Sequence, residues 1–312
     1  MRAVAIQDGR LTPVEVPEPQ PAPGEVLVDV VAAGVNRADL AQVAGTYPPP
    51  PGASELPGLE VSGYRRDTGE PVVALLAGGG YAQTVAVAPE LLLPVPEGLG
   101  MVEAAGVVEV CATVVSNLVL EAQLRAGETV LVHGASGGVG TAAVQIAHHL
   151  GARVLAVVGS AEAARAVTAL GADATIDRHE GPEGILAAAR EHGGVDVVLD
   201  VVGGSMLTTN VKALRTGGRV VVIGVLGGTR GELPVGLLMT KRARVIGTTL
   251  RSRPRDDKHA ILIRTRELVW PLVSSGAVTI PVQARFPLED AAAAHQVLRA
   301  GGHLGKVILT ID

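Results

Sequence analysis

The sequence predicts an α/β protein that combines a doubly wound parallel sheet with a second, β-rich domain. Residues 1–115 contain short strand patterns separated by Pro and Gly, whereas the middle of the chain alternates apolar strands with helices. Near-continuous apolar strands in such an alternation are typical of a parallel sheet covered on both faces. The length of 312 residues and the apolar content of 47% suit two domains with large cores.

The β-rich part is recognised by alternation and by turn residues. Glu25–Val31 alternates as a strand does, and Pro71–Leu76 and Tyr81–Val87 read as two more strands around the turn at Gly78–Gly80. Pro48–Pro51 form a rigid loop in which no strand can continue, because proline lacks the N–H group of a ladder. Short strands with frequent turns favour a barrel.

The α/β part follows as six strands and four helices. The strands are expected at Thr129–His133, Arg153–Val158, Asp173–Ile176, Val195–Val202, Arg219–Ile223 and Arg244–Leu250. The helices are expected at Gly137–Leu150, Ala161–Leu170, Ile185–Glu191 and Met206–Leu214. In the first helix Val139, Ala143 and Ile146 share one face, and Gly171 closes the second helix.

The last part of the chain returns to mixed structure. It is predicted to form a long helix at Ala260–Ser275, a strand at Val282–Phe286, a helix at Leu288–Ala300 and a strand at Lys306–Ile311. We expect the final strand to rejoin the N-terminal β domain. Residues 1–115 and 254–312 then form one domain, and residues 116–253 form a second domain that is inserted into it.

Composition excludes several classes of function. A net charge of -5 gives no basic surface for nucleic acid, and an aromatic content of 2% leaves few platforms for base stacking. A single cysteine, Cys111, allows neither an internal disulfide nor a cysteine-rich metal site. No signal peptide or long apolar run is evident, so we expect a cytoplasmic protein that does not enter a membrane.

A glycine-rich loop lies between the first strand and first helix of the α/β part. It reads His133-Gly-Ala-Ser-Gly-Gly-Val-Gly140, and Ala135-x-Gly137-x-x-Gly140 fits the dinucleotide fingerprint of a Rossmann domain with Ala in the first position. Small residues let the backbone approach a pyrophosphate, which the helix N-terminus then attracts. The alternative is an ordinary tight turn. The expected contacts are Ala135, Ser136, Gly137, Gly138, Val139 and Gly140.

The end of the second α/β strand favours NADPH over NADH. An NAD site usually places Asp or Glu there for the ribose 2′-OH, but this chain has Gly159 and Ser160. Ser160 can donate to a 2′-phosphate, and Arg178 after the third strand is the nearest cation. Ser160 also fits a plain helix N-cap, and both roles can coexist.

Several motifs resemble those of a known family. They are Ala33-Gly-Val-Asn-Arg-Ala-Asp39, Gly45-Thr-Tyr-Pro-Pro-Pro-Pro-Gly52, Gly58-Leu-Glu-Val-Ser-Gly63, Leu76-Ala-Gly-Gly-Gly-Tyr-Ala82, the glycine-rich loop and Thr248-Thr-Leu-Arg-Ser-Arg253. With them the chain resembles the quinone oxidoreductase branch of the medium-chain dehydrogenase/reductase superfamily, nearest the tumour-suppressor-inducible quinone reductases. The resemblance implies a GroES-like β-barrel catalytic domain plus a Rossmann doubly wound parallel sheet. It also implies a cleft between them and a homodimer joined along the edge strand at 244–250.

Residue types indicate that no zinc is bound. The zinc-dependent members of the superfamily have Cys where this chain has Asn36 and His where it has Leu59, and the third ligand position falls near Glu109. An amide, an alkyl chain and one carboxylate cannot make a catalytic zinc site, which needs three N, S or O ligands. Cys111 is expected to be a buried small residue. We expect no metal site.

Without a metal, the substrate must accept hydride readily, as quinones and enones do. Asn36 is the candidate donor to the substrate oxygen, although it could merely brace its loop. Tyr47 is expected to line the substrate site, or else to pack, and Thr113 matches the threonine that the family places near the nicotinamide. Three residues are expected to border the cofactor ring: Val225, Leu226 and Leu250.

The chain departs from the family pattern in three places. The segment Tyr64–Pro71 is short, Val108–Ala112 lacks the usual bulky aromatics, and Ala163 replaces a lysine, which weakens the case for NADPH. The first two changes imply a trimmed barrel and a wider or repacked substrate site.

Two other functions therefore stay open. One is an enoyl reductase acting on an acyl thioester or an enone. The phosphates of a coenzyme A substrate would require a basic groove. The only dense basic cluster is Arg251, Arg253 and Arg255, which we interpret as a solvated loop face. The other is a non-catalytic NADPH-binding protein with a structural or regulatory role.

Overall fold

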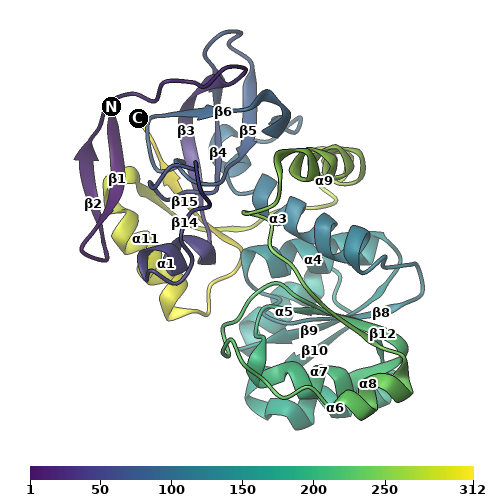
Figure 1. Cartoon of the computed structure of the whole chain (residues 1–312). Helices are drawn as coiled ribbons and strands as arrows, with labels where there is room; N and C mark the ends of the chain where they lie inside the picture. Colours follow the sequence, from purple (N-terminus) through teal and green to yellow (C-terminus); the bar gives the residue numbers. More distant parts are fainter. The chain divides into compact units, whose positions relative to one another are not determined.

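The computed structural model describes all residues, 1–312, and they pack into two units (Figure 1). The first unit comprises Met1–Ala112 and Leu250–Asp312, and the second comprises Thr113–Thr249. The boundaries expected from the sequence lie a few residues further along the chain at both junctions. Each unit has its own sheet and its own core.

The first unit is built on a sheet whose strands come from both ends of the chain. Its strand order is β14-β15-β3-β4-β5-β7, with β6 paired to β3, and a separate hairpin is formed by β1 and β2. The bounds are β1 Arg2–Gln7, β2 Arg10–Glu15, β3 Val26–Val35, β4 Glu60–Arg65, β5 Pro71–Leu75, β6 Thr84–Val87, β7 Leu92–Pro94, β14 Val282–Pro287 and β15 Lys306–Thr310. The last strand pairs antiparallel with β3, Val307 opposite Val35. It therefore rejoins the N-terminal sheet, as the sequence predicted.

The helices of the first unit are α1 Arg37–Val43, α2 Met101–Ala104, α9 Arg255–Leu268, α10 Trp270–Ser274 and α11 Ala291–Ala300, and α3 Val108–Val114 leads into the second unit. The single helix expected at Ala260–Ser275 is wrong in two respects. It starts one turn earlier, at Arg255, and it is interrupted at Val269. Pro271 explains the interruption, because proline fits the first turn of a helix but not its interior.

The second unit is a six-stranded parallel sheet in the order β10-β9-β8-β11-β12-β13. The strands are β8 Thr129–Val132, β9 Arg153–Val158, β10 Ala174–Asp177, β11 Val195–Asp200, β12 Leu214–Val222 and β13 Arg244–Gly247. The helices are α4 Gly138–His149, α5 Ala161–Ala169, α6 Gly181–Glu191, α7 Leu207–Ala213 and α8 Val235–Lys241. Apolar residues of α6, α7 and α8 pack into one core cluster, and α4 lies on the opposite face (Figure 1). The strand order reverses between β8 and β11, which is where doubly wound sheets bind ligands.

One helical stretch, Met101–Glu121, has the length and the mean hydropathy, 1.6, of a membrane span. Glu103 and Glu109 interrupt its apolar residues, so it does not stand out in the sequence as a continuous apolar run. However, 78% of its most apolar window is buried inside the protein. Burial of this kind is typical of a core helix, so the stretch is weak evidence for a membrane.

Candidate active site

The glycine-rich loop of the second unit joins β8 to α4, and two of its glycines cannot be replaced by a larger residue. Gly134 has a φ of +62°, in the left-handed region that favours glycine. A Cβ on Gly140 would lie 2.2 Å from the carbonyl oxygen of Gly134. Gly137 is the N-cap of α4, with no side-chain cap and no acidic residue in the first turn. The first N–H groups of α4 are therefore free to bind an anion.

Three of the predicted cofactor residues lie together at the ends of β9 and β10. A Cβ on Gly159 would lie 2.9 Å from Nε of Arg178, so the guanidinium lies directly against this glycine. Ser160 caps α5, since its Oγ accepts a hydrogen bond from the N–H of Ala163 at 3.1 Å. The cap uses an oxygen lone pair, so the hydroxyl proton can still be donated to a ligand.

A buried polar network beneath the glycine-rich loop was missed in the sequence analysis. His133 Nε2 lies 2.8 Å from Oδ1 of Asn210, and Asn210 Nδ2 donates to Asp200 Oδ2 at 2.9 Å. Asp200 Oδ1 accepts from the N–H groups of Val202 and Gly203. Burial lowers the pKa of His133, against the opposing effect of Asp200. A neutral imidazole thus connects the loop after β8 to the turn after β11.

That turn supports the segment that holds two further predicted residues. Gly203 has a φ of +76°, and a Cβ on it would lie 2.9 Å from the oxygen of Gly224 and 3.1 Å from Cα of Val225. The side chains of Val225 and Leu226 are exposed, at 52% and 62%. Exposed apolar residues after the end of a parallel strand, on a well-supported turn, are suited to contact a ligand.

Thr113 lies at the start of the second unit and is tied to the end of β13. Asn117 donates from Nδ2 to the carbonyl oxygen of Thr113 at 2.7 Å, and its Oδ1 accepts from the hydroxyl of Thr248 at 2.5 Å. Leu250, two residues further on, belongs to the first unit. Asn36 and Tyr47 also belong to the first unit.

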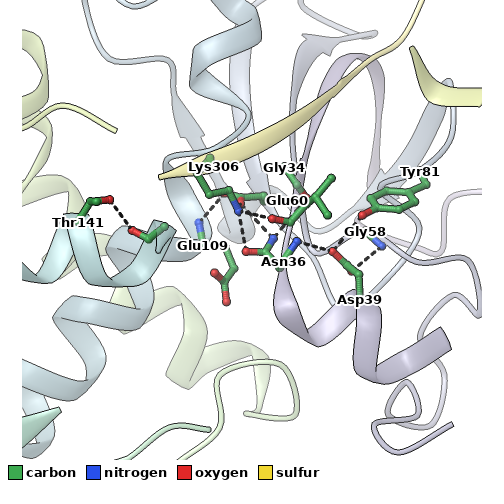
Figure 2. A network of polar contacts seen from close by, with 11 residues as sticks. Gly34, Asn36, Asp39, Gly58, Glu60, Tyr81, Glu109, Thr141 and Lys306 are labelled. Carbon is green, nitrogen blue, oxygen red and sulfur yellow. Dashed lines mark hydrogen bonds and ion pairs between the residues drawn. The ribbon is translucent and has the colours of Figure 1, made fainter. Parts of the chain in front are cut away.

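Asn36 is the N-cap of α1 and belongs to a buried charged network (Figure 2). Its Nδ2 donates to Glu60 Oε1 at 3.1 Å and to the oxygen of Gly34 at 3.3 Å. Lys306 Nζ donates to Asn36 Oδ1 at 2.7 Å and forms an ion pair with Glu60 Oε1 at 2.6 Å. The Lys306 and Glu60 side chains are 3% and 0% exposed. Both oxygens of Glu60 are used, since Oε2 accepts from the N–H of Glu109 at 2.9 Å.

A second buried chain of polar groups continues from the backbone of Asn36 (Figure 2). The N–H of Asn36 donates to Asp39 Oδ2 at 2.7 Å, and the N–H of Gly58 donates to Oδ1 at 3.1 Å. Tyr81 lies between Asp39 and His295, with its hydroxyl 3.2 Å from Asp39 Oδ2 and 3.0 Å from His295 Nε2. Burial raises the pKa of Asp39 to about 6 and lowers the pKa of His295 to about 4.

Tyr47 is half-buried beside the guanidinium of Arg251, whose carbon lies 5.4 Å from the ring centre. Arg251 is only 4% exposed, so the expectation that it forms a solvated loop face with Arg253 and Arg255 is wrong for this residue. It was missed because a cluster of arginines on the surface and one arginine turned inward look alike in sequence.

Comparisons with known proteins agree with this arrangement. Residues 22–79 match the model of the alcohol dehydrogenase GroES-like domain, and residues 138–264 match the zinc-binding dehydrogenase model. The rat protein "Quinone oxidoreductase" is 33% identical over 310 residues, which cover 95% of this chain and 92% of the rat protein. The chain belongs to the quinone oxidoreductase branch of the medium-chain dehydrogenase/reductase superfamily.

Two further relatives of this oxidoreductase show the breadth of the family. A solved structure of the quinone oxidoreductase from Thermus thermophilus, whose title includes its complex with NADPH, is 35% identical. It covers 99% of this chain and 100% of its own, with a TM-score of 0.84. A mycocerosic acid synthase-like polyketide synthase of Mycobacterium tuberculosis is 32% identical over 93% of this chain, which corresponds to 14% of the synthase.

The residues of this oxidoreductase do not fit the zinc ion that one family description implies. No group of three or more His, Cys, Asp or Glu side chains is arranged to hold a metal. The carboxylate of Glu60 is already neutralised by the ammonium of Lys306. Cys111 is fully buried, as expected, and burial raises the pKa of its thiol, which disfavours the thiolate that binds metals.

Proposed function

We propose that this chain catalyses the NADPH-dependent reduction of quinones or related conjugated carbonyl compounds by hydride transfer without a metal. The observation that carries the proposal is the Lys306–Glu60–Asn36 network. Asn36, which stands where zinc-dependent relatives are expected to have a cysteine ligand, is held by an internal ion pair between Lys306 and Glu60. Substrates that spread charge through a conjugated system need no metal to polarise the carbonyl group.

NADPH fits the second unit through two separate features. The free N–H groups at the start of α4 suit the pyrophosphate, and Arg178, Gly159 and Ser160 suit the 2′-phosphate. Val225 and Leu226, with Leu250 and Thr113, are proposed to border the nicotinamide. When bound, NADPH supplies the hydride. The Thermus thermophilus relative supports this choice of cofactor.

Within the first unit, Asn36 and Tyr47 are proposed to contact the substrate. Of the two hydrogen bonds from Asn36 Nδ2, the 3.3 Å bond to Gly34 is the longer. We assign this N–H as the donor to the substrate oxygen, because exchanging a long bond costs little. Lys306 and Glu60 keep the amide in one orientation, since Lys306 can only donate and Glu60 accepts. Solvent or the bound network supplies the proton.

The test is a steady-state assay of the purified chain with NADPH and with NADH. The acceptors are a naphthoquinone, phenanthrenequinone and a simple enone. We expect turnover with NADPH and at least one quinone, unchanged after chelator treatment, and no stoichiometric zinc by metal analysis. Quinone turnover that disappears with chelator and returns with zinc would refute the metal-free mechanism.

An enoyl reductase is the second candidate, and the match to part of a polyketide synthase favours it. A 2-enoyl thioester in the same assay separates the two. A higher kcat/KM for the thioester than for every quinone would establish this alternative. Tight NADPH binding without turnover of any acceptor would instead indicate a structural or regulatory protein.

We also propose that the chain acts as a cytoplasmic homodimer joined along the segment 244–250. The support is that β13 is the last strand of its sheet and pairs only with β12. A free edge strand can pair with a second copy of itself.

A further inference from the structure

Arg251 connects three separate segments of the first unit. Its Nε donates to the oxygen of Ala77 at 2.7 Å, Nη1 to the oxygen of Tyr47 at 3.1 Å, and Nη2 to Oε1 of Gln42 at 2.7 Å. These acceptors belong to the loop after β5, the proline-rich loop and helix α1. Arg251 is the second residue after the chain re-enters the first unit. It therefore joins the re-entry point to three segments that are distant in sequence.

The three acceptors are all neutral. No carboxylate accepts a hydrogen bond from the buried guanidinium, and burial lowers its pKa against the opposing effects of Asp39 and Tyr47. Lys258, on the first turn of α9, is a second buried cation for which no ion pair occurs, and Arg251 helps to lower its pKa. Burying a cation without a directly paired anion is costly, which indicates that the guanidinium has a specific task at this position.

We infer the task of Arg251 from the structure of the proline-rich loop, residues 45–52. Pro48–Pro51 have no N–H groups, so this loop cannot be held by a backbone ladder. The N–H groups of Thr46 and Tyr47 donate to the oxygen of Ala41 on the near side of the loop. Arg251 then makes two contacts with Tyr47. It donates a hydrogen bond to the carbonyl oxygen, and its guanidinium lies over the aromatic ring.

We propose that Arg251 is a positioning residue that fixes the ring of Tyr47 and the proline-rich loop for substrate binding. The inference rests on the proposed function, in which Tyr47 contacts the substrate. A planar fork with donors in three directions is required, because lysine would supply a single point of attachment. In this proposal Arg251 acts only through Tyr47 and the loop that holds it.

The test compares Arg251→Lys, Arg251→Met and Gln42→Met with the unchanged protein. Arg255→Met is the matched control, because Arg255 lies on the same segment and is exposed. We expect Arg251→Lys to raise the KM for the quinone about tenfold, with the Kd for NADPH within about twofold of the original. Hydrogen exchange of the amides that flank the prolines, those of Gly45 to Tyr47 and of Gly52 and Ala53, should increase in parallel, and the control should change neither quantity.

The Gln42 variant keeps the proposal testable if the Arg251 variants fold poorly. It removes one acceptor of Arg251 and also the hydrogen bond from Gln42 Nε2 to the oxygen of Glu55 at 2.8 Å, so we expect a rise in KM that is not additive with that of Arg251→Lys. Full additivity, or an unchanged KM together with unchanged exchange of the amides that flank the prolines, would overturn the proposal.

Failure of the proposed function has a different signature. If the unchanged protein reduces no acceptor, or if Tyr47→Ala leaves the KM unaltered, Tyr47 does not contact the substrate. The proposed positioning role of Arg251 in catalysis is then refuted as well. If Tyr47→Ala raises the KM and Arg251→Lys does not, the function stands and only the role of Arg251 is refuted.

Discussion

Arg178 is the residue on which the choice between NADPH and NADH depends. Its guanidinium lies against Gly159, beside the N-cap Ser160, where a 2′-phosphate would meet both. We predict that Arg178→Leu weakens NADPH binding by about 1.5–3 kcal/mol, the strength of a hydrogen bond to a charged group. NADH lacks the 2′-phosphate, so its Kd should change little. Titration of the nucleotide fluorescence measures both constants.

Arg165→Leu is the control for this prediction. Arg165 lies on α5 and is exposed, and the Arg165→Leu variant has the same net charge as Arg178→Leu. An equal loss of affinity for NADPH and NADH in Arg178→Leu would mean that the residue supports the loop rather than recognising the phosphate.

Lys306 illustrates how a buried ion pair fixes a neutral side chain. Replacing it with Met leaves the carboxylate of Glu60 buried without its counter-ion and frees the oxygen of Asn36. We predict a loss of about 3–5 kcal/mol in the free energy of unfolding, measured by urea denaturation. Adding Glu60→Gln should recover a large part of this loss, because the buried charge is then removed. No recovery in the double variant would show that packing, and not charge, causes the loss.

Asp39 and His295 have opposite effects on stability as the pH changes. The pKa of Asp39 is raised by burial from 3.8 to about 6, so the folded state holds a proton that the unfolded state has released. Stability from this group falls as the pH rises between about 4 and 6. The pKa of His295 is lowered by burial from 6.5 to about 4, so stability rises over nearly the same range.

In the unchanged protein these two contributions nearly cancel between about pH 4 and 6. We predict that His295→Gln exposes the Asp39 effect, so that the free energy of unfolding gains a slope of up to about -1.4 kcal/mol per pH unit relative to the unchanged protein. Urea denaturation at several pH values measures it. A slope unaltered from that of the unchanged protein would mean that the pKa of His295 is not lowered in the folded state, and a variant with no slope of its own would mean that Asp39 is ionised there.

At the scale of elements, regular hydrophobic periodicity decided what the sequence could predict. The six strands of the second unit were recognised because a buried parallel strand is a nearly continuous apolar run, as in β11. Strands β1 and β2 were missed, because Asp8, Gly9 and the half-buried residues around them give no clear alternation. The interruption before Pro271 was missed because the apolar pattern continues across it.

The candidate site was predictable only where local geometry imposes a residue type. The glycines at 134 and 140 are required by the turn itself, so the sequence revealed them. Lys306 and Glu60 are 246 positions apart, and their pairing depends on the register between β15, β3 and β4. The same holds for His133 with Asn210 and for Arg251 with Gln42, because no local pattern records a contact across the fold.

At the scale of the whole molecule, the chain inserts one unit into the other. The final strand completes a sheet begun by β3, so neither terminal part can bury its apolar face without the other. The polar groups proposed to contact the substrate lie in the first unit, and those proposed to hold the nucleotide lie mainly in the second. The proposed function therefore assigns residues of both units to catalysis.

The proposed homodimer is a further property of the whole molecule. Besides Val225 and Leu226, which are assigned to the nicotinamide, two exposed large hydrophobic residues, Val235 and Met239, lie between β12 and β13, close in sequence to the unpaired edge strand. Ile246 is half-buried on this edge strand, whereas its neighbour Val245 packs into the core. We predict that Ile246→Lys converts a dimer into a monomer, because edge lysines oppose strand pairing. Light scattering after size exclusion measures the mass. Ile246→Val, which keeps an apolar β-branched side chain at the same position, is the control, and a dimer in both variants would place the interface elsewhere.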